Sequence, residues 1–146
     1  MKQRSSIFTV ALFLVTNSLF SQNISGIWEG ELVQPQSSIQ SNYKLTLRLK
    51  HVGKKIEGTA TIAVDSLLAE VELVGKELKK NIFELTETVI LRHTEGKNQE
   101  WCLGKFNVVL QKSEQGKELI GTFDSKTTFS TCPISIVRLH KGLPRA

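Results

Sequence analysis

Apolar and polar residues alternate without interruption over positions 43–50, with Tyr43, Leu45, Leu47 and Leu49 at every second place. Successive side chains of a strand point to opposite faces of a sheet, so this pattern predicts a half-buried β-strand. The same alternation recurs between glycine turns, and no segment carries a convincing helical period. The expected strands cover residues 26–33, 43–50, 55–62, 68–74, 81–91, 101–111, 116–123 and 133–140.

Eight short strands at regular spacing predict an all-β fold, an eight-stranded antiparallel up-and-down β-barrel. A two-sheet sandwich is the alternative, and pairing of the first strand with the last would distinguish the two. The interior of an eight-stranded barrel is just wide enough for packed side chains or one small ligand.

A repeated glycine pattern supports closure into a barrel. The motif G-K-x-apolar-x-G-T occurs at Gly53–Thr59 and again at Gly116–Thr122. In each copy the first glycine suits the positive φ of a tight turn, and the second falls inside a strand, where it permits a bend or a close backbone approach. A further turn is expected at residues 75–78, and the basic cluster Lys76, Lys79 and Lys80 is interpreted as a solvated hairpin turn.

Glu87 is the residue that fits the apolar pattern least. Alternation places it on the inner face of its strand together with Phe83, Leu85, Val89 and Leu91. A buried carboxylate must be hydrogen-bonded, paired with a cation or protonated. Glu87 could be a polar anchor or general base in the lumen. The favoured interpretation is structural, either a β-bulge that turns the side chain outward or a buried ion pair.

The first residues have the layout of a secretory signal peptide, with Lys2 and Arg4 before a short apolar run and small residues near Ser21. We expect residues 1–21 to be removed and residues 22–146 to form one secreted or periplasmic domain without a stable transmembrane segment. The formal charge of +5 then falls to +3, because two basic residues and no acidic ones are lost. A charge this small argues against nucleic-acid binding.

Cys102 and Cys132 are the two cysteines of the chain. In an oxidising compartment an even pair most simply forms one disulfide, here joining the start of the sixth strand to the connection before the eighth. Their spacing is unlike the C-x-x-C of redox proteins.

Other candidate chemistry is sparse. Trp28 is expected to fill one end of the barrel with its indole N–H bonded to a backbone carbonyl. Trp101 is expected on the face opposite Cys102. His51, His93 and His140 fall at strand ends without metal-ligand spacing, so they are interpreted as solvated rim residues rather than a zinc site. No catalytic or phosphate-binding motif is present, which argues against an enzyme, and neither a cofactor nor a metal is predicted.

Several short motifs carry a family resemblance. These are G-x-W-x-G at Gly26–Gly30, the Tyr-led strand from Tyr43, Gly58-Thr59, Glu87 before Val89-Ile90, Trp101-Cys102-Leu103, Gly121-Thr122 and Cys132-Pro133. Together they resemble small secreted lipocalin-like barrel domains of Gram-negative bacteria, whose function is uncharacterised. The resemblance implies a barrel in which Glu87 belongs to the pattern of the fold.

Two binding functions follow from the sequence. The first is a secreted, non-enzymatic protein that holds a small apolar ligand in the barrel lumen. The second is a protein-binding module with a packed lumen, such as a secreted inhibitor or an envelope assembly factor that binds an unidentified envelope protein. For the first function the predicted ligand-binding residues are Tyr43, Leu47, Phe83 and Glu87.

Overall fold

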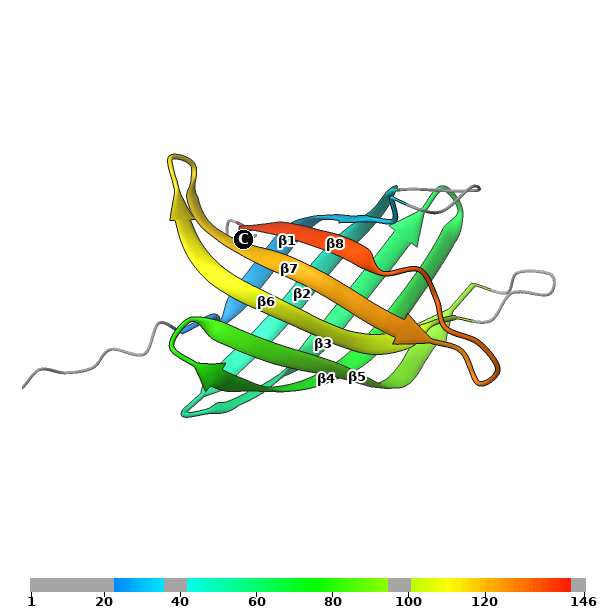
Figure 1. Cartoon of the computed structure of the whole chain (residues 1–146), viewed down its shortest axis with the longest axis horizontal. Coiled ribbons are helices and arrows are strands. Elements are labelled where there is room, and N and C mark those ends of the chain that lie inside the picture. Colours follow the sequence, from blue (N-terminus) through cyan, green and yellow to red (C-terminus); the bar gives the residue numbers. More distant parts are fainter. Residues whose placement is uncertain (1–22, 36–41, 95–100, 143–146) are drawn as a thin grey trace, which may run out of the picture.

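The computed structural model describes residues 23–35, 42–94 and 101–142, and the structural statements below refer to these residues. They form a closed barrel of eight strands without a helix (Figure 1). The predicted signal peptide lies outside the described residues. The strands are β1 (Gly26–Val33), β2 (Asn42–Val52), β3 (Lys55–Val64), β4 (Leu67–Lys79), β5 (Ile82–His93), β6 (Leu103–Ser113), β7 (Gly116–Lys126) and β8 (Ser135–Lys141).

Each strand pairs antiparallel with the next strand along the chain, and β1 also pairs with β8. The up-and-down barrel predicted from the alternation is therefore confirmed, and the sandwich alternative is rejected. The β1–β8 pairing runs from Trp28 opposite Lys141 to Val33 opposite Ile136. Closure leaves β1 and β8 without a free edge along this ladder.

The two glycine motifs act as the sequence predicts. Gly53 adopts a positive φ of 63° in the β2–β3 turn, and Gly116 adopts one of 114° as the first residue of β7, directly after the β6–β7 turn. A Cβ atom on Gly58 would collide with the carbonyl oxygen of Arg48, and one on Gly121 with the carbonyl oxygen of Asn107. Neighbouring strands can approach this closely only where a side chain is absent.

The barrel interior is filled by the inward-facing apolar side chains. Phe106 stacks on Phe123 with ring centroids 4.3 Å apart. Leu47 and Phe83, on opposite walls, have no solvent-accessible surface. Side chains without accessible surface border neither solvent nor a void that admits a water molecule, so the lumen is packed around both.

The turn predicted at residues 75–78 is wrong. Strand β4 continues through this segment to Lys79, with Gly75 opposite Leu85 and Lys76 opposite Glu84. The chain reverses instead at residues 80–81, where Asn81 takes the positive φ of 65°. Gly75 is required for a different reason than a turn, because a Cβ atom at this position would collide with β5.

The inward orientation predicted for Val89 and Leu91 is also wrong. Their side chains are 52% and 50% exposed. In the β4–β5 ladder, Glu87 pairs with Leu73 and Val89 pairs with Glu72. Leu73 and Glu72 are adjacent in β4, so Thr88 is an extra residue in β5. A β-bulge of this kind reverses the alternation that follows it, which turns Val89 outward. Strands β6 and β8 also begin two residues later than expected, so Cys102 precedes β6.

Candidate functional site

One end of the barrel is closed by the residues that precede β1, and we call Asn23–Ser25, Trp28, His51 and Phe83 the closed end. Ile24 is fully buried there, and the indole N–H of Trp28 donates a 2.9 Å hydrogen bond to its carbonyl oxygen. The predicted role of Trp28 is thus confirmed. The ammonium group of Lys141 lies 5.7 Å from the centre of the tryptophan ring.

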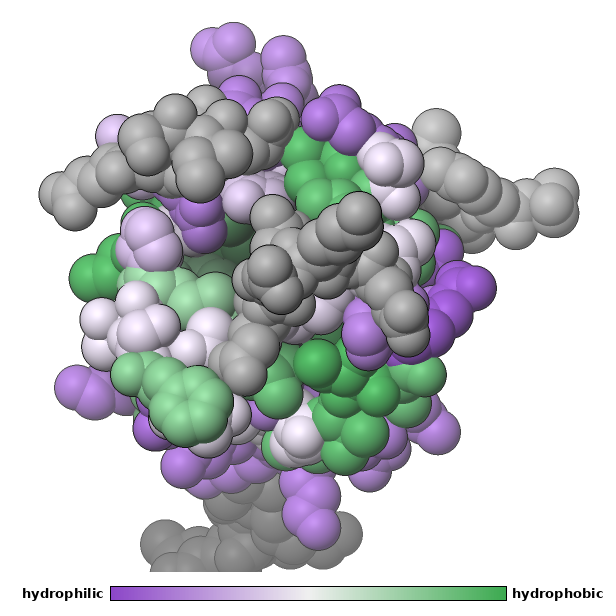
Figure 2. All heavy atoms as spheres, turned by 90° about the vertical axis from the view of Figure 1, so that its right-hand side faces the viewer, coloured by the Kyte–Doolittle hydropathy of each residue, from purple (hydrophilic) through white to green (hydrophobic). Residues whose placement is uncertain are grey.

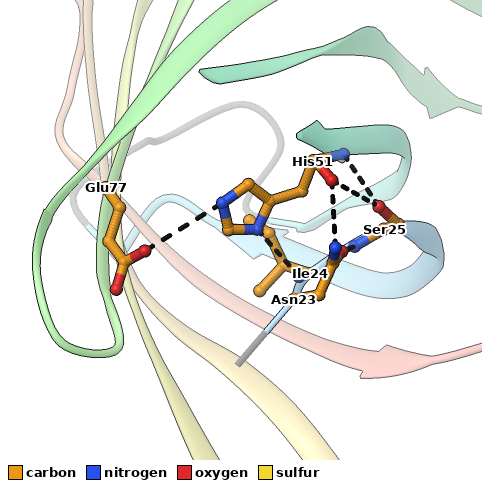
Figure 3. Close-up of polar contacts among 5 residues, drawn as sticks. All are labelled: Asn23, Ile24, Ser25, His51 and Glu77. Carbon is orange, nitrogen blue, oxygen red and sulfur yellow. Dashed lines mark hydrogen bonds and ion pairs between the residues drawn. The ribbon is translucent and has the colours of Figure 1, made fainter. Parts of the chain in front are cut away.

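His51 ties this N-terminal segment to β2 (Figure 3). The ring Nδ1 atom of His51 accepts a hydrogen bond from the main-chain N–H of Ile24 at 3.2 Å. The main-chain N–H of His51 donates to Ser25 Oγ at 2.8 Å. The amide of Asn23 donates to the carbonyl oxygen of His51 at 2.9 Å. Because Nδ1 accepts a hydrogen bond, the ring proton is assigned to Nε2, which lies 4.0 Å from Glu77 Oε2.

The interpretation of His51 as a solvated rim residue is wrong. Its ring is buried and packs edge-to-face on Phe83, with centroids 5.7 Å apart. His93 lies exposed near the other end of the barrel. The Nδ1 atom of His140 lies 3.3 Å from Glu118 Oε1. The three histidines do not converge, and the described residues contain no group of three or more side chains that could hold a metal ion.

The opposite end carries the disulfide, and we call Glu87, Gly104, Ser135, the Cys102–Cys132 disulfide and the β7–β8 loop (residues 127–134) the disulfide end. Cys102 and Cys132 are bonded as predicted, with Cα atoms 6.4 Å apart. The bond fixes the start of β6 to the β7–β8 loop. Figure 2, which faces this end, shows hydrophobic side chains exposed among hydrophilic ones.

Glu87 points into the barrel at this end and is 6% exposed. Its Oε2 atom accepts the N–H of Gly104 at 3.1 Å, and its Oε1 atom has no hydrogen-bond partner among the described residues. Burial raises the pKa of Glu87 to about 8, and the Gly104 hydrogen bond opposes this only in part. The side chain is therefore mostly protonated and neutral at pH 7. The inward position predicted from the alternation is confirmed. The favoured structural interpretations are wrong, because the β-bulge lies after Glu87, at Thr88, and does not turn its side chain outward, and no ion pair of Glu87 is seen among the described residues.

The β7–β8 loop holds an aromatic side chain in solvent. Phe129, near its tip, is 87% exposed, and Ile134 is 59% exposed. The Oγ1 atom of Thr127 accepts the N–H groups of Phe129 and Ser130 at 3.3 and 3.1 Å. The main chain of Thr127 also donates to the carbonyl oxygen of Ser130 at 2.8 Å. The loop is therefore braced by hydrogen bonds as well as by the disulfide.

The residues predicted to bind a small ligand are divided between core and rim. Leu47 and Phe83 belong to the central apolar cluster, and Tyr43 packs against its edge, partly buried. Glu87 lies outside that cluster at the disulfide end. Ser135, also inside the barrel at this end, is fully buried, and its hydroxyl oxygen has no hydrogen-bond partner in the part of the chain that the structure describes.

Two grooves lie on the outer wall of the barrel. The larger, of about 760 Å³, crosses β1 to β5 over Gly58, and its rim carries Arg48 and Lys50 as well as Glu57 and Glu72. The smaller, of about 420 Å³, lies beside Gly30 with Glu29, Glu31 and Lys44 along it. Both signs of charge line each groove, so neither favours an anionic or a cationic ligand.

Three features of these two ends are not apparent from the alternation. They are the His51 network, the unpaired hydroxyl of Ser135 and the exposed Phe129. Phe129 has a local signal, because it stands alone among lysine, threonine and serine in Lys-Thr-Thr-Phe-Ser-Thr. The His51 contacts have none, because they join positions 26 to 28 residues apart.

Comparison of the chain with protein-family models, with curated proteins and with solved structures gives no match in any of the three. The resemblance to lipocalin-like domains of Gram-negative bacteria therefore stays a prediction. Among the described residues, no helix is long and apolar enough to cross a membrane.

Proposed function

We propose that the mature chain is a secreted, non-enzymatic protein-binding module that contacts its partner through the β7–β8 loop. The observation that carries this proposal is Phe129, a large aromatic side chain held 87% exposed at the tip of a braced loop. Exposed aromatic anchors contribute a large share of binding energy in protein interfaces. Two further large apolar side chains are also exposed, Ile134 of the same loop at 59% and Ile136 of β8 at 51%.

The bracing of the loop favours binding because a rigid loop loses little conformational entropy in a complex. Thr127 and Ser130 fix the turn from within, and the N–H of Cys132 donates to the carbonyl oxygen of Ser125 at 3.0 Å. The disulfide joins the same segment to β6. The Cys102–Cys132 bond also supports an oxidising compartment, because such bonds persist in secreted and periplasmic proteins.

A small apolar ligand in the lumen is the second candidate, favoured by the unpaired Oε1 of Glu87 and the unpaired hydroxyl of Ser135. A ligand with a polar group could satisfy either atom. Leu47 and Phe83 are however packed without accessible surface, so a ligand that reached them would have to displace core side chains. This packing is the reason for ranking the protein-binding module first.

Photocrosslinking tests the first candidate. A benzophenone amino acid at position 129, in place of Phe129, should crosslink a protein in the periplasmic or secreted fraction of the source organism. The same group in place of Val52, which is 65% exposed at the closed end, is the matched control. Phe129→Ala should abolish retention of the crosslinked protein on immobilised mature chain, while Val52→Ala should retain it. Equal crosslinking from both positions, or none from either, would contradict the proposal.

Fluorescent fatty-acid binding tests the second candidate. Leu47→Trp would fill any remaining lumen space, so a lumen ligand should bind the native protein and not this variant. Binding that is absent from the native protein, or equal in both, would remove the lumen function. Because Phe129 lies in the solvent, Phe129→Ala should leave any fatty-acid binding unchanged.

A further inference from the structure

The barrel has an incomplete ladder at the disulfide end. On one side β5 pairs with β4 as far as His93, but on the other side it pairs with β6 only from Ile82 to Thr86. Residues 101–104, which would continue the ladder on the β6 side, form no pair with β5. We call the edge of β5 at residues 87–90, together with Gly104 opposite it, the seam.

Two features hold the seam apart. The extra residue Thr88 bulges β5 immediately after the last buried position, which bends the strand. The disulfide holds Cys102 against Cys132 of the β7–β8 loop rather than against β5. The exposed Val89 and Leu91 follow the bulge on the same strand.

Glu87 bridges the seam with one of its two oxygen atoms. Oε2 takes the N–H of Gly104, which a β5 carbonyl would accept in a continuous ladder. Oε1 is buried with no hydrogen-bond partner among the described residues. Because the carboxyl group is mostly protonated at pH 7 and Oε2 accepts a hydrogen bond, the proton is assigned to Oε1. A buried hydroxyl without an acceptor is costly, so this atom marks a place where an acceptor would be stabilising.

We propose that the seam binds an extended polypeptide segment of a partner protein as an added strand beside β5. The Oε1 hydroxyl of Glu87 donates to a main-chain carbonyl oxygen of the added strand, and an apolar side chain of that strand packs on Val89. An extended main chain is the occupant that fits, because it alone presents alternating donors and acceptors at the spacing of a strand edge.

Nuclear magnetic resonance of the isotope-labelled mature protein tests this site with a model strand, acetyl-Lys-Thr-Val-Thr-Val-Thr-Val-Lys-amide, at up to about 1 mM, the range of weak specific binding. We expect amide shifts at residues 87–90 and at Gly104. The same peptide N-methylated at its valines lacks the main-chain N–H groups that would donate to carbonyl oxygens of β5. It should bind at least about tenfold more weakly, a difference of about 1.4 kcal/mol.

A pair of lysine variants locates the site on the edge. Val89→Lys places a charge on the seam and should weaken peptide binding at least about tenfold. Val109→Lys is the matched control, since Val109 is 42% exposed but lies in β6 between Ile82 and Ile120, and it should bind as the native protein does.

Failure of the peptide to bind, equal binding of the N-methylated peptide, or shifts confined to residues outside the seam would overturn the proposal. The N-methylated comparison uses the native protein, so it decides the question even if Val89→Lys does not fold. The β7–β8 loop is unchanged in these variants, so loss of peptide binding with Phe129 crosslinking intact would separate this site from the proposed function.

Discussion

The two ends of the barrel are held together in different ways. At the closed end, the N-terminal segment supplies Ile24 as an apolar filler, and each main-chain group that His51 contacts has a hydrogen-bond partner. At the disulfide end, a covalent bond fixes the connections. Each end keeps buried polar atoms that have no hydrogen-bond partner among the described residues: Nε2 of His51 at the closed end, and Oε1 of Glu87 and the hydroxyl of Ser135 at the disulfide end. The closed end is thus held by packing and by hydrogen bonds between distant segments, whereas the disulfide end is held by a covalent bond.

The largest expected effect is at the closed end. Trp28→Ala removes a fully buried indole and its hydrogen bond to Ile24, and should lower the free energy of unfolding by about 3–5 kcal/mol. Urea unfolding of the mature protein measures this change. A loss below about 1 kcal/mol would show that Trp28 does not anchor the closed end.

Removing the disulfide should have a comparable effect at the other end. The bond closes a loop with a sequence separation of 30, so the Cys102→Ala/Cys132→Ala double variant should lose about 3–4 kcal/mol in the free energy of unfolding. Amide hydrogen exchange should rise most in the β7–β8 loop and in the first residues of β6, beyond the increase that the lower global stability causes at the closed end. Uniformly faster exchange would contradict the separation of the two ends.

Glu87 should make the stability of the protein depend on pH. Its pKa is about 8 in the folded protein against 4.5 as the ordinary value, so between these pH values the folded state holds a proton that the unfolded chain has released. Stability from this group is therefore full below pH 4.5 and falls as pH rises, by at most about 1.4 kcal/mol per pH unit, until about pH 8.

Glu87→Gln should flatten this slope, as measured by urea unfolding at pH 5 and pH 8.5. Glu57→Gln, which changes an exposed carboxylate of β3, is the control and should keep the slope of the native protein. Identical slopes in Glu87→Gln and the native protein would show that burial of this carboxyl does not control the response.

The smallest effects compare a ring nitrogen that accepts a hydrogen bond with a hydroxyl that has no partner among the described residues. His51→Phe preserves a ring against Phe83 but leaves the N–H of Ile24 without its acceptor, at a cost of about 1–3 kcal/mol. Ser135→Ala removes a hydroxyl that has no partner among the described residues and should change stability by less than about 0.5 kcal/mol. Thermal unfolding of both variants tests the comparison, and a larger loss from Ser135→Ala would reverse it.

Local pattern was sufficient for most of the barrel. The alternation at Tyr43 to Leu49 predicted which side chains of β2 face inward, because the period of two in a strand needs no knowledge of the partner strand. The alternation of β5 predicted Phe83, Leu85 and Glu87 correctly and then failed at Val89, because a bulge depends on the register of the neighbouring strand. The turn predicted at Gly75 failed for a similar reason, since close approach to β5 also requires a glycine.

The sequence by itself determined the eight strands, the glycine turns at Gly53 and Gly116, the pairing of Cys102 with Cys132 and the inward position of Glu87, because each depends on local periodicity or on simple counting. Only the tertiary structure decided that His51 is buried beneath the N-terminal segment, that the β5–β6 ladder stops at Thr86 and that Phe129 stands in solvent on a braced loop. These features arise where segments distant in the chain meet, and a hydrogen bond or a missing pair between such segments leaves no periodic trace in the residues that form it.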